Sequence, residues 1–145
     1  MNLSDQVCSL EYAKKLKELG VKQDSIFYWS VNKEGNNESM VIWNLQYPCY
    51  ANQTNMYKLS VDYPQYYEVF SAFTCAELIE MIPHLPDPHR ISFGIENPNI
   101  DCGGKYYAMH DVVDYPCDHF WYSNNLANCI AAMLINLIET GAHKP

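Results

Sequence analysis

The sequence predicts an α+β protein in which a mostly antiparallel sheet of four to six strands is packed by two or three helices. Apolar residues recur at helical spacing near both ends of the chain, and the C-terminal stretch is apolar over about half of its circumference. Between them lie short runs of β-branched and aromatic residues separated by turn-forming clusters. The chain has 145 residues, 48% hydrophobic and 18% charged. This composition suits one domain with its own core, so residues 1–145 are expected to form a single unit.

The first two helices are expected from their end signals. Ser9 is a candidate N-cap for a helix that ends at Gly20, where a left-handed residue is favoured. Thr74 and Glu77 have the spacing of a capping box, in which each side chain accepts a hydrogen bond from the other residue's backbone N–H. Pro83 ends that second helix, because proline cannot continue the hydrogen-bond ladder.

The last helix is the longest, and it is expected from Asn124 or Asn125 to Thr140, with Gly141 as its stop. Its wide apolar arc needs a sheet on one side and helices on another. We therefore expect the C-terminal helix at the centre of the core.

Strands are expected at residues 26–31 and 39–45, which form a hairpin around a Gly-Asn-Asn turn. A short strand is expected at 56–61, and two more at 90–95 and 105–110. The stretch from 110 to 119 is interpreted as an acidic loop that connects the last strand to the final helix.

The charge disfavours extended nucleic-acid binding. The formal net charge is −8: residues 1–33 carry five lysines against four acids, and residues 34–145 carry four cations against thirteen acids. Binding along a phosphate backbone needs many cations, and Arg90 is the one arginine of the chain. A small anion held by one or two cations remains compatible with this composition.

The six cysteines have no CxxC spacing, and the N-terminus lacks the basic and apolar segments of a secretory signal. No apolar run approaches the roughly 18 residues that span a bilayer. We expect reduced thiols and a soluble protein of the cytoplasm with no cofactor.

Three helical blocks are similar to parts of known proteins. They are Leu10–Gly20 (LEYAKKLKELG), Ala72–Pro83 (AFTCAELIEMIP) and Asn125–Glu139 (NLANCIAAMLINLIE). Together they resemble uncharacterised small accessory proteins encoded by phages and prophages. The resemblance covers roughly a third of the chain. It implies a viral or mobile-element origin, and it carries over no catalytic residue.

One segment has side chains suited to a divalent metal. The candidate ligands are His110, Asp114, Cys117 and His119. Their spacing matches no established zinc motif, so the connecting loop is the competing interpretation.

Nucleophilic or acid–base chemistry is weakly supported. Cys117 with His119, or Cys102 with His110, would form a Cys-His pair, but the surplus of carboxylates there would raise a thiol pKa. Asp111 with Asp114 would give paired carboxylates for hydrolysis.

Aromatic residues make up 14% of the chain, and adjacent pairs such as Tyr106-Tyr107 place one ring on each face of a strand. One ring of each pair can fill the core, while the other faces a partner or a ligand. For a bound ligand we expect Arg90 as the counter-charge, Tyr106 or Tyr107 for stacking, and Trp43 as a further contact.

These observations predict a non-enzymatic phage or mobile-element protein in the host cytoplasm. We expect it to bind a host protein or a small, nucleotide-like signalling ligand and to act against host defence. A homo-oligomer is also compatible with the sequence. The alternatives are a small metal-dependent hydrolase centred on residues 110–119, an acidic DNA-mimic inhibitor that occupies a nucleic-acid-binding protein, and a virion component.

Overall fold

The structure of the chain is a computed structural model. It describes residues 5–32, 43–44, 67–82, 89–95, 103–112 and 115–143. Within these ranges the elements are α1 (Leu10–Glu18), β1 (Phe27–Asn32), β2 (Trp43–Asn44), β3 (Tyr67–Ser71), α3 (Cys75–Met81), β4 (His89–Ile95), β5 (Tyr106–Val112), β6 (Tyr115–Ser123) and α4 (Leu126–Glu139). The predicted α+β class and antiparallel strand pairing are confirmed.

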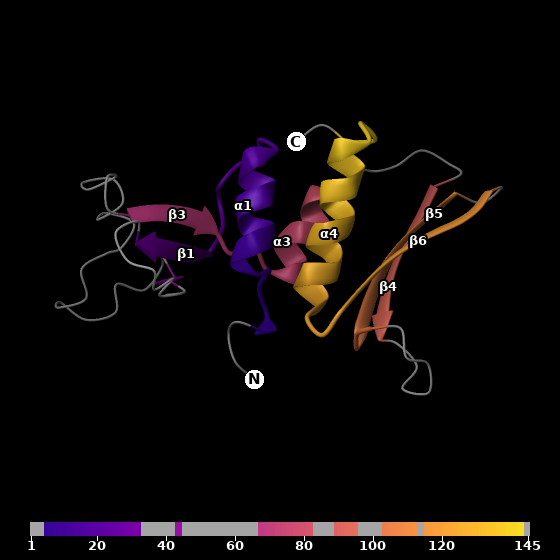
Figure 1. The fold of residues 1–145 in the computed structure, drawn as a ribbon, viewed down its shortest axis with the longest axis horizontal. Helices are drawn as coiled ribbons and strands as arrows, with labels where there is room; N and C mark the ends of the chain where they lie inside the picture. The colour runs from indigo at the N-terminus through magenta and orange to yellow at the C-terminus, as the bar shows by residue number, and fades with distance from the viewer. Residues whose placement is uncertain are drawn as a thin grey trace.

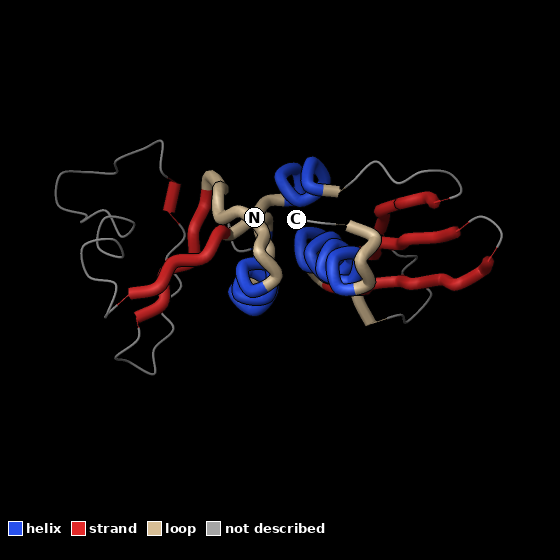
Figure 2. The backbone as a smooth tube through the Cα atoms, turned by 90° about the horizontal axis from the view of Figure 1, so that it is seen from above, coloured by secondary structure: helices blue, strands red, loops and turns tan. Residues whose placement is uncertain are grey.

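The six described strands form two three-stranded sheets, in the orders β2-β1-β3 and β4-β5-β6, and each of these pairs is antiparallel. The helices lie between the two sheets (Figures 1 and 2). The sequence suggested one sheet, because strand runs alone do not show which strands pair. The division follows from the helices, since each sheet buries one face against the helical layer.

Two strands were not predicted. β3 pairs along its whole length with β1, from Tyr28↔Ser71 to Asn32↔Tyr67. Of the segment 110–119, interpreted as an acidic connecting loop, β5 includes residues 110–112 and β6 includes residues 115–119, so that interpretation was wrong. Pro116 is compatible with β6 because this strand lies at the edge of its sheet, where one row of backbone groups needs no partner.

The predicted hairpin is present where the structure describes it. β2 pairs with β1, with Tyr28 opposite Trp43. The rest of the 39–45 strand and the strand expected at 56–61 lie outside the described residues.

The helix ends agree with the sequence prediction except at Ser9, which stands at the N-cap position of α1 but makes no capping hydrogen bond with its side chain. Gly20 and Gly141 adopt left-handed φ angles of 88° and 77° after α1 and α4. The capping box of α3 is complete: Thr74 Oγ1 accepts from the Glu77 N–H at 3.3 Å, and the Glu77 carboxylate accepts from the Thr74 N–H at 2.7 Å. These helix ends depend on residues only a few positions apart, which explains why the spacing of residues in the sequence was enough to predict them.

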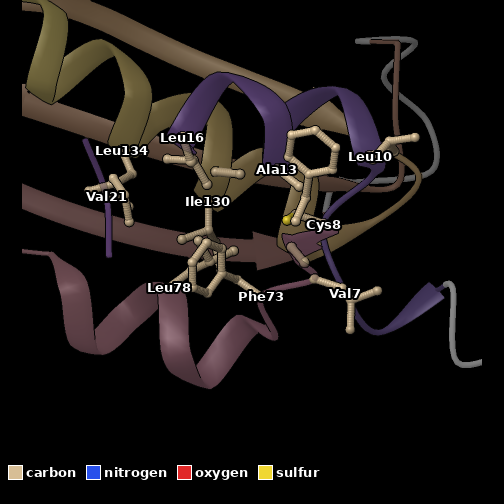
Figure 3. Close-up of a cluster of buried hydrophobic side chains, with 14 of the residues drawn as sticks. Val7, Cys8, Leu10, Ala13, Leu16, Val21, Phe73, Leu78, Ile130 and Leu134 are labelled. Atoms are coloured by element: carbon tan, nitrogen blue, oxygen red, sulfur yellow. The ribbon is translucent and has the colours of Figure 1, made fainter. Parts of the chain in front are cut away.

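The main core joins the described helices α1, α3 and α4 to the first sheet (Figure 3). α4 lies in its middle, as predicted, and also covers the second sheet. The fully buried side chains with the largest volume are Trp29, Phe73, Leu16, Leu78, Ile130, Met133, Leu134 and Leu137.

The chain segment just before α1 is held by the core around it. The Cys8 N–H donates to the Phe73 carbonyl at 2.8 Å. The Cys8 carbonyl accepts from the indole N–H of Trp29 at 2.9 Å. Both bonds are buried, so each satisfies a backbone group that water cannot reach.

Two asparagines at the start of α4 hold the same segment from the other side. Asn125 Nδ2 donates to the Val7 carbonyl at 2.8 Å, and Asn128 Oδ1 accepts from the Ser9 N–H at 2.7 Å. The N-terminal segment and the C-terminal helix are thereby joined across more than a hundred residues of sequence.

None of the described helices combines the length and the apolar character needed to cross a membrane.

Candidate functional site

The second sheet has one face packed against α4 and one face that no helix of the described residues covers (Figures 1 and 2). Ala108 of β5 is fully buried against Cys129, Met133 and Leu137 of α4. Because side chains alternate along a strand, the neighbours of Ala108 point to the opposite side. We call that side the outer face. Its described side chains are Arg90, Ser92, Gly94, Tyr107, Met109, Asp111, Phe120 and Tyr122.

Three rings form an aromatic group on the outer face: Tyr107, Phe120 and Tyr122. The rings of Phe120 and Tyr122 are stacked, with centroids 5.8 Å apart and planes 15° apart. Tyr107 meets Phe120 edge-on at 6.3 Å and 62°. Such contacts orient rings beyond what area burial alone does. Phe120 remains 38% exposed, so the group presents apolar surface to solvent in a defined orientation.

Gly94 makes room for this arrangement. It lies opposite Tyr107 on β4, and a Cβ at position 94 would lie 2.6 Å from a ring carbon and 2.7 Å from the hydroxyl of Tyr107. The tyrosine ring therefore lies across the backbone of the neighbouring strand. Any other residue at position 94 would force the ring to move.

The other end of the outer face is charged. Arg90 is exposed and lies opposite Asp111. Among the residues that the structure describes, Arg90 forms no ion pair. Gly94 lies four positions along β4 from Arg90, or roughly 13 Å. A ligand that spans from the charge to the rings must therefore be extended.

The structure separates the four predicted ligand contacts. Arg90 and Tyr107 share the outer face. Tyr106 lies on the opposite face, packed beside the core under α4, with Lys105 Nζ 5.1 Å from its ring centroid. Trp43 belongs to β2 of the first sheet. The outer face instead adds Phe120, which spacing could have indicated, since it stands two residues before Tyr122 in a period-two run.

The predicted metal ligands are only partly described. His110 and His119 lie directly opposite each other on β5 and β6, and His119 has a ring contact with Trp121 at 6.2 Å. Asp114 lies outside the described residues, and so does the side chain of Cys117. Within the described ranges, no three His, Cys, Asp or Glu side chains gather in a way that could hold a metal ion.

The remaining chemical candidates are likewise incomplete. Cys102 and Asp114 lie outside the described residues, so the structure describes neither the Cys102–His110 pair nor the Asp111–Asp114 pair. The thiols that the structure does describe are free. Burial raises the pKa of Cys8 to about 12 and that of Cys129 to about 11. A thiol held protonated is a poor nucleophile and a poor metal ligand.

No protein-family model, curated protein or solved structure matches the chain. The function is therefore argued from the geometry of the outer face.

Proposed function

We propose that this chain is a non-enzymatic accessory protein of a phage or mobile element, and that it binds a host protein through the outer face of the β4-β5-β6 sheet. The observation that carries the proposal is the aromatic group of Tyr107, Phe120 and Tyr122, which is ordered by ring contacts and is covered by none of the described helices. Aromatic side chains dominate the energetics of protein interfaces because they offer a large contact area and few rotatable bonds.

The outer face is one side of an open three-stranded sheet, and a surface of this kind favours a protein over a small molecule. Small ligands bind in concave sites that bury most of their surface. Two hollows are lined by described residues away from this face, one between α1 and α4 and one beside α3 and α4. A protein surface can cover a flat face without a pocket.

The size of the face indicates how such a partner would bind. Three strands about 4.8 Å apart and seven residues long give roughly 14 Å by 24 Å, or about 340 Å². A standard interface buries about 800 Å² on each partner. The outer face would therefore be the centre of a larger contact that includes the segments around it.

The charge of the chain favours a basic partner. Residues 34–145 include the whole second sheet and carry thirteen acids against four cations. Complementary charge raises association rates and suppresses wrong partners. A DNA mimic would need carboxylates in rows, whereas the described side chains of the outer face include one acid, Asp111.

The test begins with tagged protein produced in host cells, identification of co-purifying proteins, and reconstitution with each purified candidate. Binding is then measured by calorimetry for wild type, Phe120→Ser and Ile79→Ser. Ile79 is the matched control because it is 44% exposed, similar to Phe120 at 38%, but lies on α3. We expect Phe120→Ser to weaken binding by at least 30-fold, the effect of losing about 2 kcal/mol at an interface centre.

Two results would contradict the proposal. One is a partner whose affinity is lowered equally by Phe120→Ser and Ile79→Ser. The other is a folded, tagged protein that retains no host protein under any growth condition tested.

A further inference from the structure

A cavity of about 260 Å³ lies where four parts of the chain converge, away from the outer face. Its walls come from the segment after α1, the last turn of α3, the middle of α4 and the residues after α4. The lining residues are Val21, Lys22, Met81, Leu134 and His143.

The interior of the cavity is apolar. Leu134 is fully buried, and Val21 is 7% exposed; Figure 3 shows these two side chains near each other at the margin of the core. Met81 completes the apolar wall, and methionine adapts readily to the shape of a bound group. The volume is just below the 300–1,000 Å³ typical of drug-sized sites, so the cavity suits a smaller ligand.

The two polar residues of the lining are both hydrogen-bond donors. Lys22 has three N–H donors, and one of them reaches the Asp24 carboxylate at 2.8 Å. His143 has at least one ring N–H donor in every protonation state. None of the five lining residues is a carboxylate, so the polar edge of the cavity suits an acceptor, above all a negatively charged one.

His143 is held in place rather than lying in a frayed tail. Gly141 adopts a left-handed φ of 77°, and its N–H donates to the Ile138 carbonyl at 3.0 Å. The His143 N–H then donates to the Leu137 carbonyl at 3.0 Å. This end of α4 turns the chain back and brings residue 143 to the cavity.

We propose that this cavity binds a small amphiphilic monocarboxylate, whose hydrocarbon part lies against Val21, Met81 and Leu134 and whose carboxylate accepts hydrogen bonds from Lys22 and His143. Uncharged or cationic ligands of the same shape keep the apolar contacts but lose the hydrogen bonds from Lys22 and His143 to a carboxylate. The site is independent of the outer face, and the failure of either proposal leaves the other standing.

The proposal is tested by titrating the isotope-labelled full chain with hexanoate and following backbone amide shifts by NMR. We expect saturable shifts centred on residues 21, 22, 81, 134 and 143, with a Kd of about 1 mM or tighter. Affinity should rise roughly fourfold for each methylene from acetate to hexanoate. Hexylamine and hexan-1-ol should bind at least tenfold more weakly than hexanoate.

Charge variants test the polar contacts. Lys22→Glu should weaken hexanoate binding at least tenfold, and His143→Ala severalfold. Lys105→Glu is the control, because it makes the same charge change at an exposed position just before β5; its effect should stay within twofold. The unliganded spectrum of each variant shows whether it is folded.

The proposal is overturned by hexanoate shifts that are absent, unsaturable or spread over the surface. It is also overturned if hexylamine binds as tightly as hexanoate, or if Lys22→Glu behaves like Lys105→Glu.

Discussion

Replacing Asn125 with serine should destabilise the protein by about 1–3 kcal/mol. Asn125 has two separable roles: its Oδ1 caps α4 by accepting from the Ala127 N–H at 2.8 Å, and its Nδ2 donates to the buried Val7 carbonyl at 2.8 Å. Serine caps helices as well as asparagine does, but its side chain is too short to reach Val7. The variant therefore leaves a buried carbonyl unsatisfied, and this sets the expected cost.

Two further variants separate the cost of losing the helix cap from the cost of losing the bond to Val7. Asn125→Ala removes the cap as well and should cost about 1 kcal/mol more than Asn125→Ser. Asn124→Ser is the control, because Asn124 is exposed and accepts only at the surface, from the Lys105 N–H at 3.2 Å; its cost should stay below about 0.5 kcal/mol.

Urea unfolding followed by tryptophan fluorescence measures these differences. With an m-value of about 2 kcal/mol/M, a loss of 2 kcal/mol lowers the midpoint by about 1 M. An unchanged m-value shows that the native and unfolded states are otherwise comparable. If Asn125→Ser shifts the midpoint no further than Asn124→Ser, the bond to Val7 does not stabilise the fold, and the reasoning about the N-terminal segment is refuted.

Three further outcomes are expected. Gly94→Ala should lower the free energy of unfolding by about 1–3 kcal/mol by crowding the Tyr107 ring. In chemical denaturation, the same change made in a Tyr107→Ala background should cost much less. Equal costs in the two backgrounds would show that positions 94 and 107 do not touch. Gly104→Ala should cost more than Gly94→Ala, because its Cβ would lie 2.5 Å from the backbone nitrogen of Ser123, which cannot move aside as a ring can; an equal or smaller loss in the same assay would contradict this. Burial raises the pKa of Cys8 from 9.0 to about 12, so the protonated thiol stabilises the fold fully below pH 9, and this contribution is lost as the pH rises towards 12. Cys8→Ala should therefore show a flatter dependence of unfolding free energy on pH above 9 than wild type, and identical slopes would refute the assignment.

The helices could be predicted closely because their ends are encoded by nearby residues. Thr74 and Glu77 satisfy each other's backbone across three positions, and Gly141 supplies a left-handed stop directly after α4. The strands were harder, since a strand is stabilised by partners distant in sequence. Tyr67–Ser71 and Tyr115–Ser123 contain acids or a proline that argue against a strand, yet each pairs along most of its length.

The candidate site was found only in part for the same reason. Alternation along β5 already places Tyr106 and Tyr107 on opposite faces, but it does not say which of them α4 covers. Phe120 escaped notice because its segment was interpreted as a loop, and its ring contacts depend on β6 pairing with β5.

The sequence by itself determined the α+β class, the three helices with their capping residues, the acidic charge and the pairing of neighbouring aromatic residues on opposite strand faces. Those properties depend on residues within a few positions of one another or on composition. The tertiary structure alone decided that the strands divide between two sheets, that α4 packs on the face with Tyr106 and leaves Tyr107 with Phe120 on the outer face, and that His143 and Lys22 line one cavity. These depend on contacts between distant segments, and the position of α4 between the sheets fixes them.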